Sequence, residues 1–205
     1  MSFYRFARAV TGALAKVFYR VRYHGRENEP QGGTVIVLSN HASLVDPVFT
    51  ANAVRRELTF VAKSDLAGST PFGLLVKYCR AITVRRGESD LQAVRAVVSA
   101  LNEGKSLGIY PQGTRMPGAA PSPEQALAGV GLMASRTKAT LLPVAICCGK
   151  NKKGKPCVFR RVDVYVGKPI PYEEYSTINE RPSSHEIAAY GFSKVCDLFA
   201  EHNGK

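Results

Sequence analysis

The chain has 205 residues, of which 45% are hydrophobic and 21% are charged. This balance excludes a disordered chain, and the length fits one domain with a core of its own. An excess of basic residues, 28 Lys and Arg against 16 Asp and Glu, gives a formal net charge of +12 and predicts an anionic partner: nucleic acid, anionic lipid or a phosphorylated substrate.

The N-terminal segment, residues 2–21, has the periodicity of an amphipathic helix. At about 100° per residue its apolar positions fall on one side: Phe3, Phe6, Val10, Leu14, Val17, Phe18 and Val21. The other side carries the basic residues Arg5, Arg8, Lys16 and Arg20. A basic amphipathic helix with aromatic residues suits a membrane surface. A terminal helix packed on the core, with a solvated basic face, is the alternative.

The rest of the chain alternates between strand and helix patterns. The expected strands are 34–40, 57–63, 81–84, 106–111, 140–148 and 158–170. The expected helices are 46–56, 71–79, 89–104, 129–138 and 183–202. These elements predict an α/β fold: a single domain (25–205) with a mostly buried mixed sheet flanked by helices, preceded by the N-terminal amphipathic helix (1–24).

The sequence also bears on the compartment. Its cysteines have no CxxC spacing and are odd in number: Cys79, Cys147, Cys148, Cys157 and Cys196. They indicate free thiols in a reducing compartment and no zinc site. No apolar run reaches about 18 residues, so no transmembrane helix is expected. Basic residues interrupt the apolar runs of the N-terminus, which therefore lacks a signal-peptide pattern. We expect a cytoplasmic location.

Polar residues gather where three of the expected strands end: "NHASLVD" after the first, "TVRR" at the third and "YPQGTR" after the fourth. In open α/β sheets, ligands bind in the crevice at the carboxyl ends of the strands. We therefore expect these three clusters to form one site.

His41 and Asp46 stand five residues apart in the first cluster. A tight turn would bring the carboxylate onto the imidazole, where it fixes one ring nitrogen and leaves the other as a base. No GxSxG or HExxH motif occurs, so the base would act directly on a substrate hydroxyl, with a thioester as electrophile. The plainer alternative is that Asp46 caps the helix 46–56, with Pro47 at its first position. Both roles are compatible, because a carboxylate has two oxygens. Ser43 is a candidate nucleophile, but a structural hydrogen bond is its expected role.

The third cluster offers Gly113, the Thr114 hydroxyl and the Arg115 guanidinium in one loop. Such a group suits a phosphate, because Arg presents a fork of donors. Arg86, at the end of the second cluster, would supply a second arm. Taken singly, each of these two arginines is more simply explained as a surface charge.

The clusters resemble the sequence blocks of the glycerolipid acyltransferases, in particular the bacterial-type 1-acyl-sn-glycerol-3-phosphate acyltransferases. The family's NHxSxxD block is met in full by Asn40, His41, Ser43 and Asp46. Its second block resembles "ITVRR", with Arg86 in the Arg position, and its third, FPEGTR, resembles "YPQGTR". Its fourth, an apolar stretch around a proline, resembles "LLPVAI" with Pro143. "AKSDL", with Lys63, and "GKPI" are further landmarks, and the similarity runs from about residue 31 to 172.

The resemblance implies transfer of an acyl chain from acyl-CoA or acyl carrier protein to the free hydroxyl of 1-acyl-sn-glycerol 3-phosphate, giving phosphatidic acid without a cofactor. It implies His41 as general base and Asp46 as its orienting partner. The acceptor would be bound by residues of the second and third blocks and by a nearby lysine: Arg86, Gln112, Gly113, Thr114, Arg115 and Lys63. Supporting positions would be Asn40, Ser43 and Pro143. The partners would be the lysophospholipid, the acyl thioester and an anionic membrane surface, with the protein peripheral on the cytoplasmic side of the membrane.

Two departures from the family leave the acceptor open. Gln112 replaces the usual Glu, and Ala128 stands where many relatives have a Lys. Another lysophospholipid or glycerol 3-phosphate itself is therefore an alternative acceptor. A rival of another class is a non-catalytic basic module that binds membranes or nucleic acid. It explains the net charge but not the complete first block, and no nucleic-acid-binding motif occurs.

Overall fold

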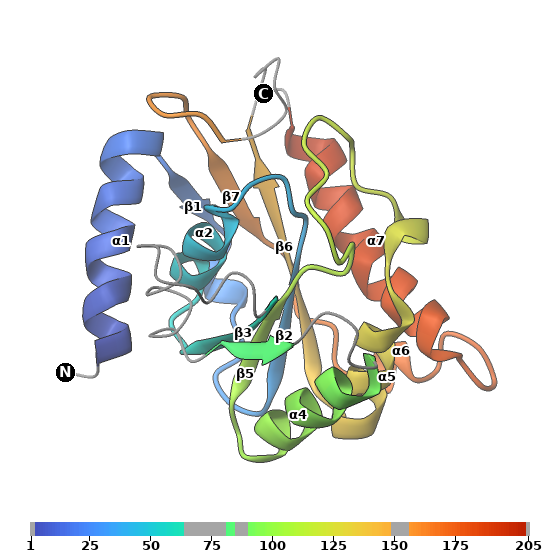
Figure 1. Cartoon of the computed structure of the whole chain (residues 1–205). Helices are drawn as coiled ribbons and strands as arrows, with labels where there is room; N and C mark the ends of the chain where they lie inside the picture. The colour runs from blue at the N-terminus through green and yellow to red at the C-terminus, as the bar shows by residue number, and fades with distance from the viewer. Residues whose placement is uncertain (1–2, 64–80, 85–89, 149–155, 204–205) are drawn as a thin grey trace.

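The structure is a computed structural model, which describes residues 3–63, 81–84, 90–148 and 156–203 (Figure 1). Within these ranges, seven strands form one sheet in the order β1-β7-β6-β2-β5-β3-β4. They are β1 (Arg22–His24), β2 (Val35–Ser39), β3 (Leu58–Lys63), β4 (Ile82–Val84), β5 (Ser106–Ile109), β6 (Thr140–Cys147) and β7 (Asp163–Val166). β7 runs antiparallel to β6, and the other pairs of these described strands are parallel. The carboxyl ends of β2, β5 and β6 therefore meet at one edge of the sheet.

Helices cover both faces of the sheet (Figure 1). One face carries α1 (Phe3–Tyr19) and α2 (Asp46–Ala53). The other carries α4 (Asp90–Asn102), α5 (Ala128–Thr137) and α7 (Ser184–His202). Short elements among the described residues are the α-helix α6 (Tyr172–Tyr175) and the 3-10 helices η1 (Arg26–Asn28) and η3 (Pro123–Gln125).

The central strand β2 is buried on both faces. Ile36 and Leu38 pack into the core under α4, α5 and α7, whereas Val35 and Val37 pack toward α1 and α2. A strand between two parallel neighbours and two helical layers must be apolar at successive positions, which explains the uninterrupted run "VIVL". This rigid strand delivers the residues that follow it to a fixed place at the edge of the sheet.

The expected α/β architecture is confirmed: a mixed sheet flanked by helices and preceded by an N-terminal helix. Two details differ. The expected strand 158–170 is a strand only over Asp163–Val166. The three-residue strand β1 was not expected, and it pairs with β7, so a domain boundary at residue 24 would separate it from its own sheet. The expected helix 71–79 lies outside the described residues.

α1 docks on the protein through the side opposite its apolar stripe. Its buried residues are Tyr4, Gly12 and Ala15, and the Tyr4 hydroxyl accepts a hydrogen bond from the Leu58 backbone N–H at 2.9 Å. A Cβ on Gly12 would lie 2.4 Å from the Asn52 side chain, so the helix approaches α2 closely there. Arg8, on the basic side of the helix, donates to backbone carbonyls at the end of α2 and just after it.

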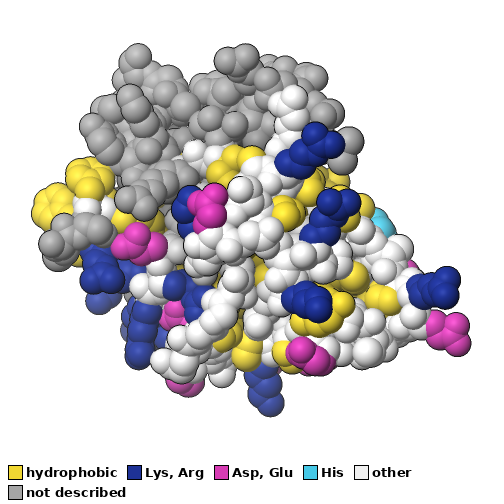
Figure 2. Space-filling model, turned by 90° about the horizontal axis from the view of Figure 1, so that it is seen from below, with side chains coloured by type: hydrophobic (Ala, Val, Ile, Leu, Met, Phe, Trp, Pro, Cys, Tyr) yellow, Lys and Arg dark blue, Asp and Glu magenta, His cyan; other side chains and the backbone are white. Residues whose placement is uncertain are grey.

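The apolar stripe of α1 is exposed to solvent. Six of its members keep between 40% and 64% of their surface accessible: Phe3, Phe6, Val10, Leu14, Val17 and Phe18. Figure 2, seen from below, shows hydrophobic side chains at the left edge, on the side where Figure 1 places α1, with Lys and Arg side chains beside them. Of the two orientations that the sequence left open, the structure has the apolar stripe facing outward. Within the described part of the chain, no helix is both long and apolar enough to cross a bilayer.

Candidate active site

Asn40, the first residue after β2, continues the pairing of β2 with β6 through its side chain. Its amide donates to the Ile146 carbonyl at 3.0 Å and accepts from the Ile146 N–H at 2.8 Å. Asn40 is buried, so both bonds are shielded from water. This two-way contact fixes the point at which the chain leaves the sheet and begins the turn that carries His41.

The turn brings His41 and Asp46 together, as the sequence predicts. The imidazole Nδ1 lies 2.7 Å from Asp46 Oδ2; the Asp46 side chain is fully buried, and that of His41 is 16% exposed. A carboxylate can only accept, so Nδ1 carries the proton and Nε2 is the unprotonated nitrogen of the neutral ring. The pair therefore has the geometry of a general base with an orienting carboxylate.

Asp46 does not cap its helix in the expected way. It is the first residue of α2, and Val45 occupies the N-cap position. Its Oδ2 instead accepts from the backbone N–H groups of Ala42 and Ser43, each at 2.7 Å. The carboxylate thus closes the turn that precedes the helix, because that turn presents two N–H groups beside the imidazole. The same oxygen fixes the turn and the ring.

Tyr110 forms one wall against the imidazole. Its ring stacks on that of His41 with centroids 4.1 Å apart and planes 16° apart. Its hydroxyl shares a hydrogen bond of 3.2 Å with Thr50 Oγ1 of α2, and burial raises the pKa of Tyr110 well above its usual value. Tyr110 and Thr50 were not among the predicted site residues. The one signal for Tyr110 was its place at the start of "YPQGTR", directly after a strand.

The loop after β5 holds the backbone of His41 from both sides. The His41 N–H donates to Gln112 Oε1 at 2.9 Å, and the His41 carbonyl accepts from the Met116 N–H at 2.8 Å. Gln112 is buried, whereas Gly113, Thr114 and Arg115, between these two contacts, are exposed. The first and third clusters therefore meet in space, and the exposed tip of the third lies next to the histidine.

Gly113 has a backbone φ of 65°, in the left-handed region that glycine adopts readily. A Cβ at this position would lie 2.5 Å from a methyl carbon of Leu127. The left-handed turn therefore favours glycine here, whereas the Leu127 methyl belongs to an exposed side chain that can move aside at little cost.

The remaining predicted residues have more distant or structural places. The Ser43 hydroxyl accepts from the Val45 N–H at 3.5 Å, a contact within the turn. Pro143 lies opposite Leu38 in the sheet, and its carbonyl accepts from the Gly167 N–H. Lys63 is the last residue of β3, whose carboxyl end lies at the same edge as His41. Arg86 lies outside the described residues.

A cavity of about 240 Å³ opens beside His41. Its walls come from the turn after β2, the loop after β5, the end of β6 and the C-terminal end of α7. The lining residues that sequence reasoning did not single out for the site include Cys148, Phe199 and Asn203. Burial raises the pKa of the Cys148 thiol to about 12, so this sulfur is protonated at neutral pH and is a poor nucleophile.

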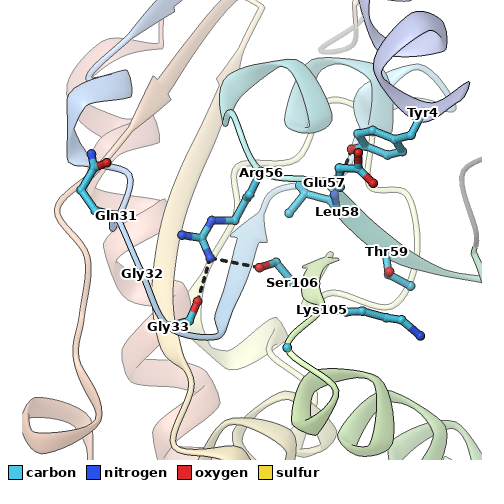
Figure 3. A pocket seen from close by; sticks show the side chains of 11 residues that line it. Tyr4, Gln31, Gly32, Gly33, Arg56, Glu57, Leu58, Thr59, Lys105 and Ser106 are labelled. Carbon is cyan, nitrogen blue, oxygen red and sulfur yellow. Dashed lines mark hydrogen bonds between the residues drawn. The ribbon is translucent and has the colours of Figure 1, made fainter. Parts of the chain in front are cut away.

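A second cavity, of about 370 Å³, lies at the opposite edge of the sheet (Figure 3). It is lined by residues at or beside the amino ends of β3 and β5, such as Leu58 and Ser106. The guanidinium of Arg56 donates there to the Gly33 carbonyl and to Ser106 Oγ, both at 3.0 Å, and also contacts the buried Glu29. Arg56 therefore already has partners within the protein. The cavity lies at the edge of the sheet opposite to His41, so it does not belong to the site around that histidine.

The sequence and the fold of this chain are similar to those of known proteins. A family model described as Acyltransferase matches residues 20–147, which include the first and third clusters. The chain is 26% identical to a 1-acyl-sn-glycerol-3-phosphate acyltransferase of Streptococcus pneumoniae over 87% of this chain and 66% of that protein. It is 24% identical to the protein of the same name in Bacillus subtilis, over 91% of this chain and 90% of the relative.

Among solved structures, the 1-acyl-sn-glycerophosphate acyltransferase of Thermotoga maritima superposes with a TM-score of 0.68, covering 98% of this chain and 83% of that one. Because the two sequences are only 23% identical, this similarity establishes the fold alone. The family model spans more than half of the 205 residues, and the chain therefore belongs to the Acyltransferase family.

Proposed function

We propose that the protein transfers a fatty acyl chain from an acyl thioester, acyl-CoA or acyl carrier protein, to the free hydroxyl of 1-acyl-sn-glycerol 3-phosphate. The product is phosphatidic acid. The observation that carries the proposal is the contact of 2.7 Å between His41 Nδ1 and Asp46 Oδ2, beside a cavity that His41 lines. The names of the Streptococcus and Bacillus relatives support the choice of acceptor.

In the proposed reaction, the acceptor hydroxyl gives its proton to His41 Nε2 while its oxygen attacks the thioester carbonyl carbon. The tetrahedral intermediate then expels the thiolate, which takes from the imidazolium the proton that the acceptor hydroxyl gave up. Asp46 holds the ring in place and stabilises the positive charge that the ring carries between these two steps. The stacked Tyr110 ring offers its π face to the same charge.

The oxyanion of the intermediate needs hydrogen-bond donors. The N–H groups of Ala42 and Ser43 already donate to Asp46, and that of Val48 donates to the Val45 carbonyl. The start of α2 therefore has few donors to spare. The Gly113 N–H likewise donates to the Tyr110 carbonyl, so we place the oxyanion donors in the backbone N–H groups of Thr114 and Arg115, in the exposed loop that adjoins His41 through its two anchoring contacts.

For the acceptor phosphate we propose the side chains of Thr114 and Arg115. Both are exposed on the loop whose ends hold His41, so a phosphate bound there would keep the glycerol hydroxyl near the base. Arg supplies paired donors that match two phosphate oxygens. We propose Arg86 and Lys63 as additional contacts to the phosphate. Lys63 is the last residue of β3, and Arg86 follows β4 in the sequence. Both strands run parallel to β5, so their carboxyl ends lie at the same edge of the sheet.

We propose that the protein works as a peripheral protein on an anionic membrane surface, on the cytoplasmic side. The exposed apolar stripe of α1 and the net charge of +12 support this proposal. Phe159 extends the apolar surface beyond the end of α1: it is 63% exposed, and its ring centroid lies 6.1 Å from that of Phe18. An enzyme whose acceptor and product are both lipids gains direct access to them from such a surface.

The test is a thiol-release assay with purified protein, a long-chain acyl-CoA and three acceptors in parallel: lysophosphatidate, a zwitterionic lysophospholipid and glycerol 3-phosphate. We expect thiol release to depend on lysophosphatidate, with phosphatidate as the product by mass spectrometry. Release with another acceptor alone would keep the chemistry and overturn the acceptor. No acceptor-dependent release with either acyl-CoA or acyl carrier protein as donor would overturn the proposed function.

A further inference from the structure

Gln112, which contacts the turn 41–46 at the His41 N–H, also forms a direct hydrogen bond with Gln125. Gln112 Nε2 donates to Gln125 Oε1 at 2.7 Å, and it also approaches Met116 Sδ at 3.3 Å. Gln125 is the last residue of η3, thirteen positions further along the chain, and its Oε1 also accepts from the Ser122 N–H at 3.2 Å. One oxygen of Gln125 therefore serves two donors.

The direction of this hydrogen bond is fixed by backbone groups at both ends. The His41 N–H can only donate, so it requires the oxygen of Gln112 on its side, and this turns the NH₂ of Gln112 toward Gln125. The Ser122 N–H likewise requires the oxygen of Gln125. Rotating either amide by 180° would set a donor against a donor. The two side chains thus fit together in one arrangement only.

We infer that Gln125 is a positioning residue for the His41 base and acts on it through Gln112. This inference deepens the proposed function, and its kinetic part rests on it. The hydrogen bonds form a continuous path. The Ser122 N–H and the Gln112 side-chain amide both donate to the Gln125 oxygen, and the Gln112 oxygen accepts from the His41 N–H. The chain between the two glutamines supplies part of the cavity wall, at Met116 and at residues 118–121. The histidine and this wall are therefore held by one network.

The network also explains the glutamine at position 112, where the FPEGTR block of the glycerolipid acyltransferases has glutamate. A glutamate there would still accept from the His41 N–H, but its second oxygen would face Gln125 Oε1, acceptor against acceptor. The clash is relieved only if the carboxylate moves off His41 or if Gln125 turns and abandons the Ser122 N–H. A glutamate at position 125, by contrast, accepts from both present donors. Two substitutions that add the same charge at neighbouring side chains are thus predicted to have unequal effects.

The experiment compares Gln112→Glu, Gln125→Glu and Gln125→Leu with wild type. We expect kcat to fall about tenfold or more in Gln112→Glu and Gln125→Leu, because a buried polar group loses its partner, while the KM for the acceptor changes little. In Gln125→Glu, which keeps the acceptor, kcat should stay at least about fivefold above that of Gln112→Glu. A general effect of added charge would lower both glutamate variants alike, and that result would overturn the inference.

A second measurement does not depend on activity. Amide hydrogen exchange, followed by NMR, reports the protection of the His41 and Ser122 N–H groups. In Gln112→Glu, at least one of these two amides should exchange about tenfold faster than in wild type. In Gln125→Leu, both amides should exchange about tenfold faster. In Gln125→Glu, both amides should keep their wild-type protection. Unchanged protection in the first two variants would overturn the inference. If wild type is inert toward every acceptor while the exchange pattern follows this order, the proposed function fails and the positioning network stands.

Discussion

The Tyr110 ring stacks on the imidazole of His41, with planes 16° apart and ring centroids 4.1 Å apart. Asp46 fixes one edge of the imidazole, and Tyr110 covers one of its faces, so the ring has little freedom to rotate away from the cavity. The Tyr110 hydroxyl ties this wall to Thr50 of α2.

From this arrangement we predict unequal effects of two substitutions at position 110. Tyr110→Phe keeps the stacked ring and loses only the hydrogen bond to Thr50, so kcat should fall less than about fivefold. Tyr110→Ala removes the ring and leaves a cavity, and kcat should fall roughly tenfold to a hundredfold while unfolding occurs at a lower temperature. Steady-state kinetics and thermal unfolding of both variants check this. Equal turnover in the two variants would show that stacking does not matter.

Asp46 has two roles that substitution can separate. Asp46→Asn keeps an oxygen for the Ala42 and Ser43 N–H groups but loses the charge that stabilises the imidazolium, so turnover should fall while the fold persists. Asp46→Ala also removes the acceptor of both N–H groups. It should therefore cost about 1–3 kcal/mol of unfolding free energy for each group left unpaired, in addition to the loss of turnover. Denaturant unfolding distinguishes the variants, and equal stability would contradict the turn-closing role.

Arg115 is predicted to act on the acceptor rather than on the chemical step. Arg115→Ala should raise the KM for lysophosphatidate at least about tenfold, because a charge-assisted contact to phosphate is lost, with a smaller change in kcat. Arg136→Ala is the matched control, since Arg136 is also an exposed arginine but lies in the last turn of α5. Acceptor saturation curves that coincide for the two variants would remove Arg115 from the phosphate site.

The exposed stripe of α1 is predicted to bind membranes. The double variant Phe6→Ser, Leu14→Ser should lower partitioning onto vesicles of anionic lipid at least about tenfold, because each of these side chains contributes about 1.5–3 kcal/mol when fully buried. Ala9→Ser, at an exposed but small residue of the same helix, is the control. Binding should also weaken as salt rises. Equal co-sedimentation of the double variant and the control would contradict a membrane role for the stripe.

The local parts of the site could be predicted from the sequence, because they are written in a few adjacent residues. The turn from His41 to Asp46 needs only six residues, and the capping box that starts α7 needs Ser183 and Glu186 alone. β2 was evident because a strand buried on both faces must be continuously apolar.

The parts that the sequence did not reveal depend on contacts between distant segments. Nothing in the sequence indicated that Gln125, at the end of η3, contacts Gln112. The role of Thr50 depends on the packing of α2 against β5. For α1, amphipathicity identified two faces but not the one that docks. The small residues Gly12 and Ala15 decide this, because they let the helix lie close to α2.

The most direct test of the central claim is the turnover of His41→Ala with lysophosphatidate and a long-chain acyl-CoA. A positioned general base contributes about 10²- to 10⁴-fold, so kcat should fall by that factor while the unfolding temperature stays close to that of wild type. His185→Ala, at an exposed histidine in the first turn of α7, should retain wild-type turnover. Wild-type turnover in a folded His41→Ala protein would contradict the account.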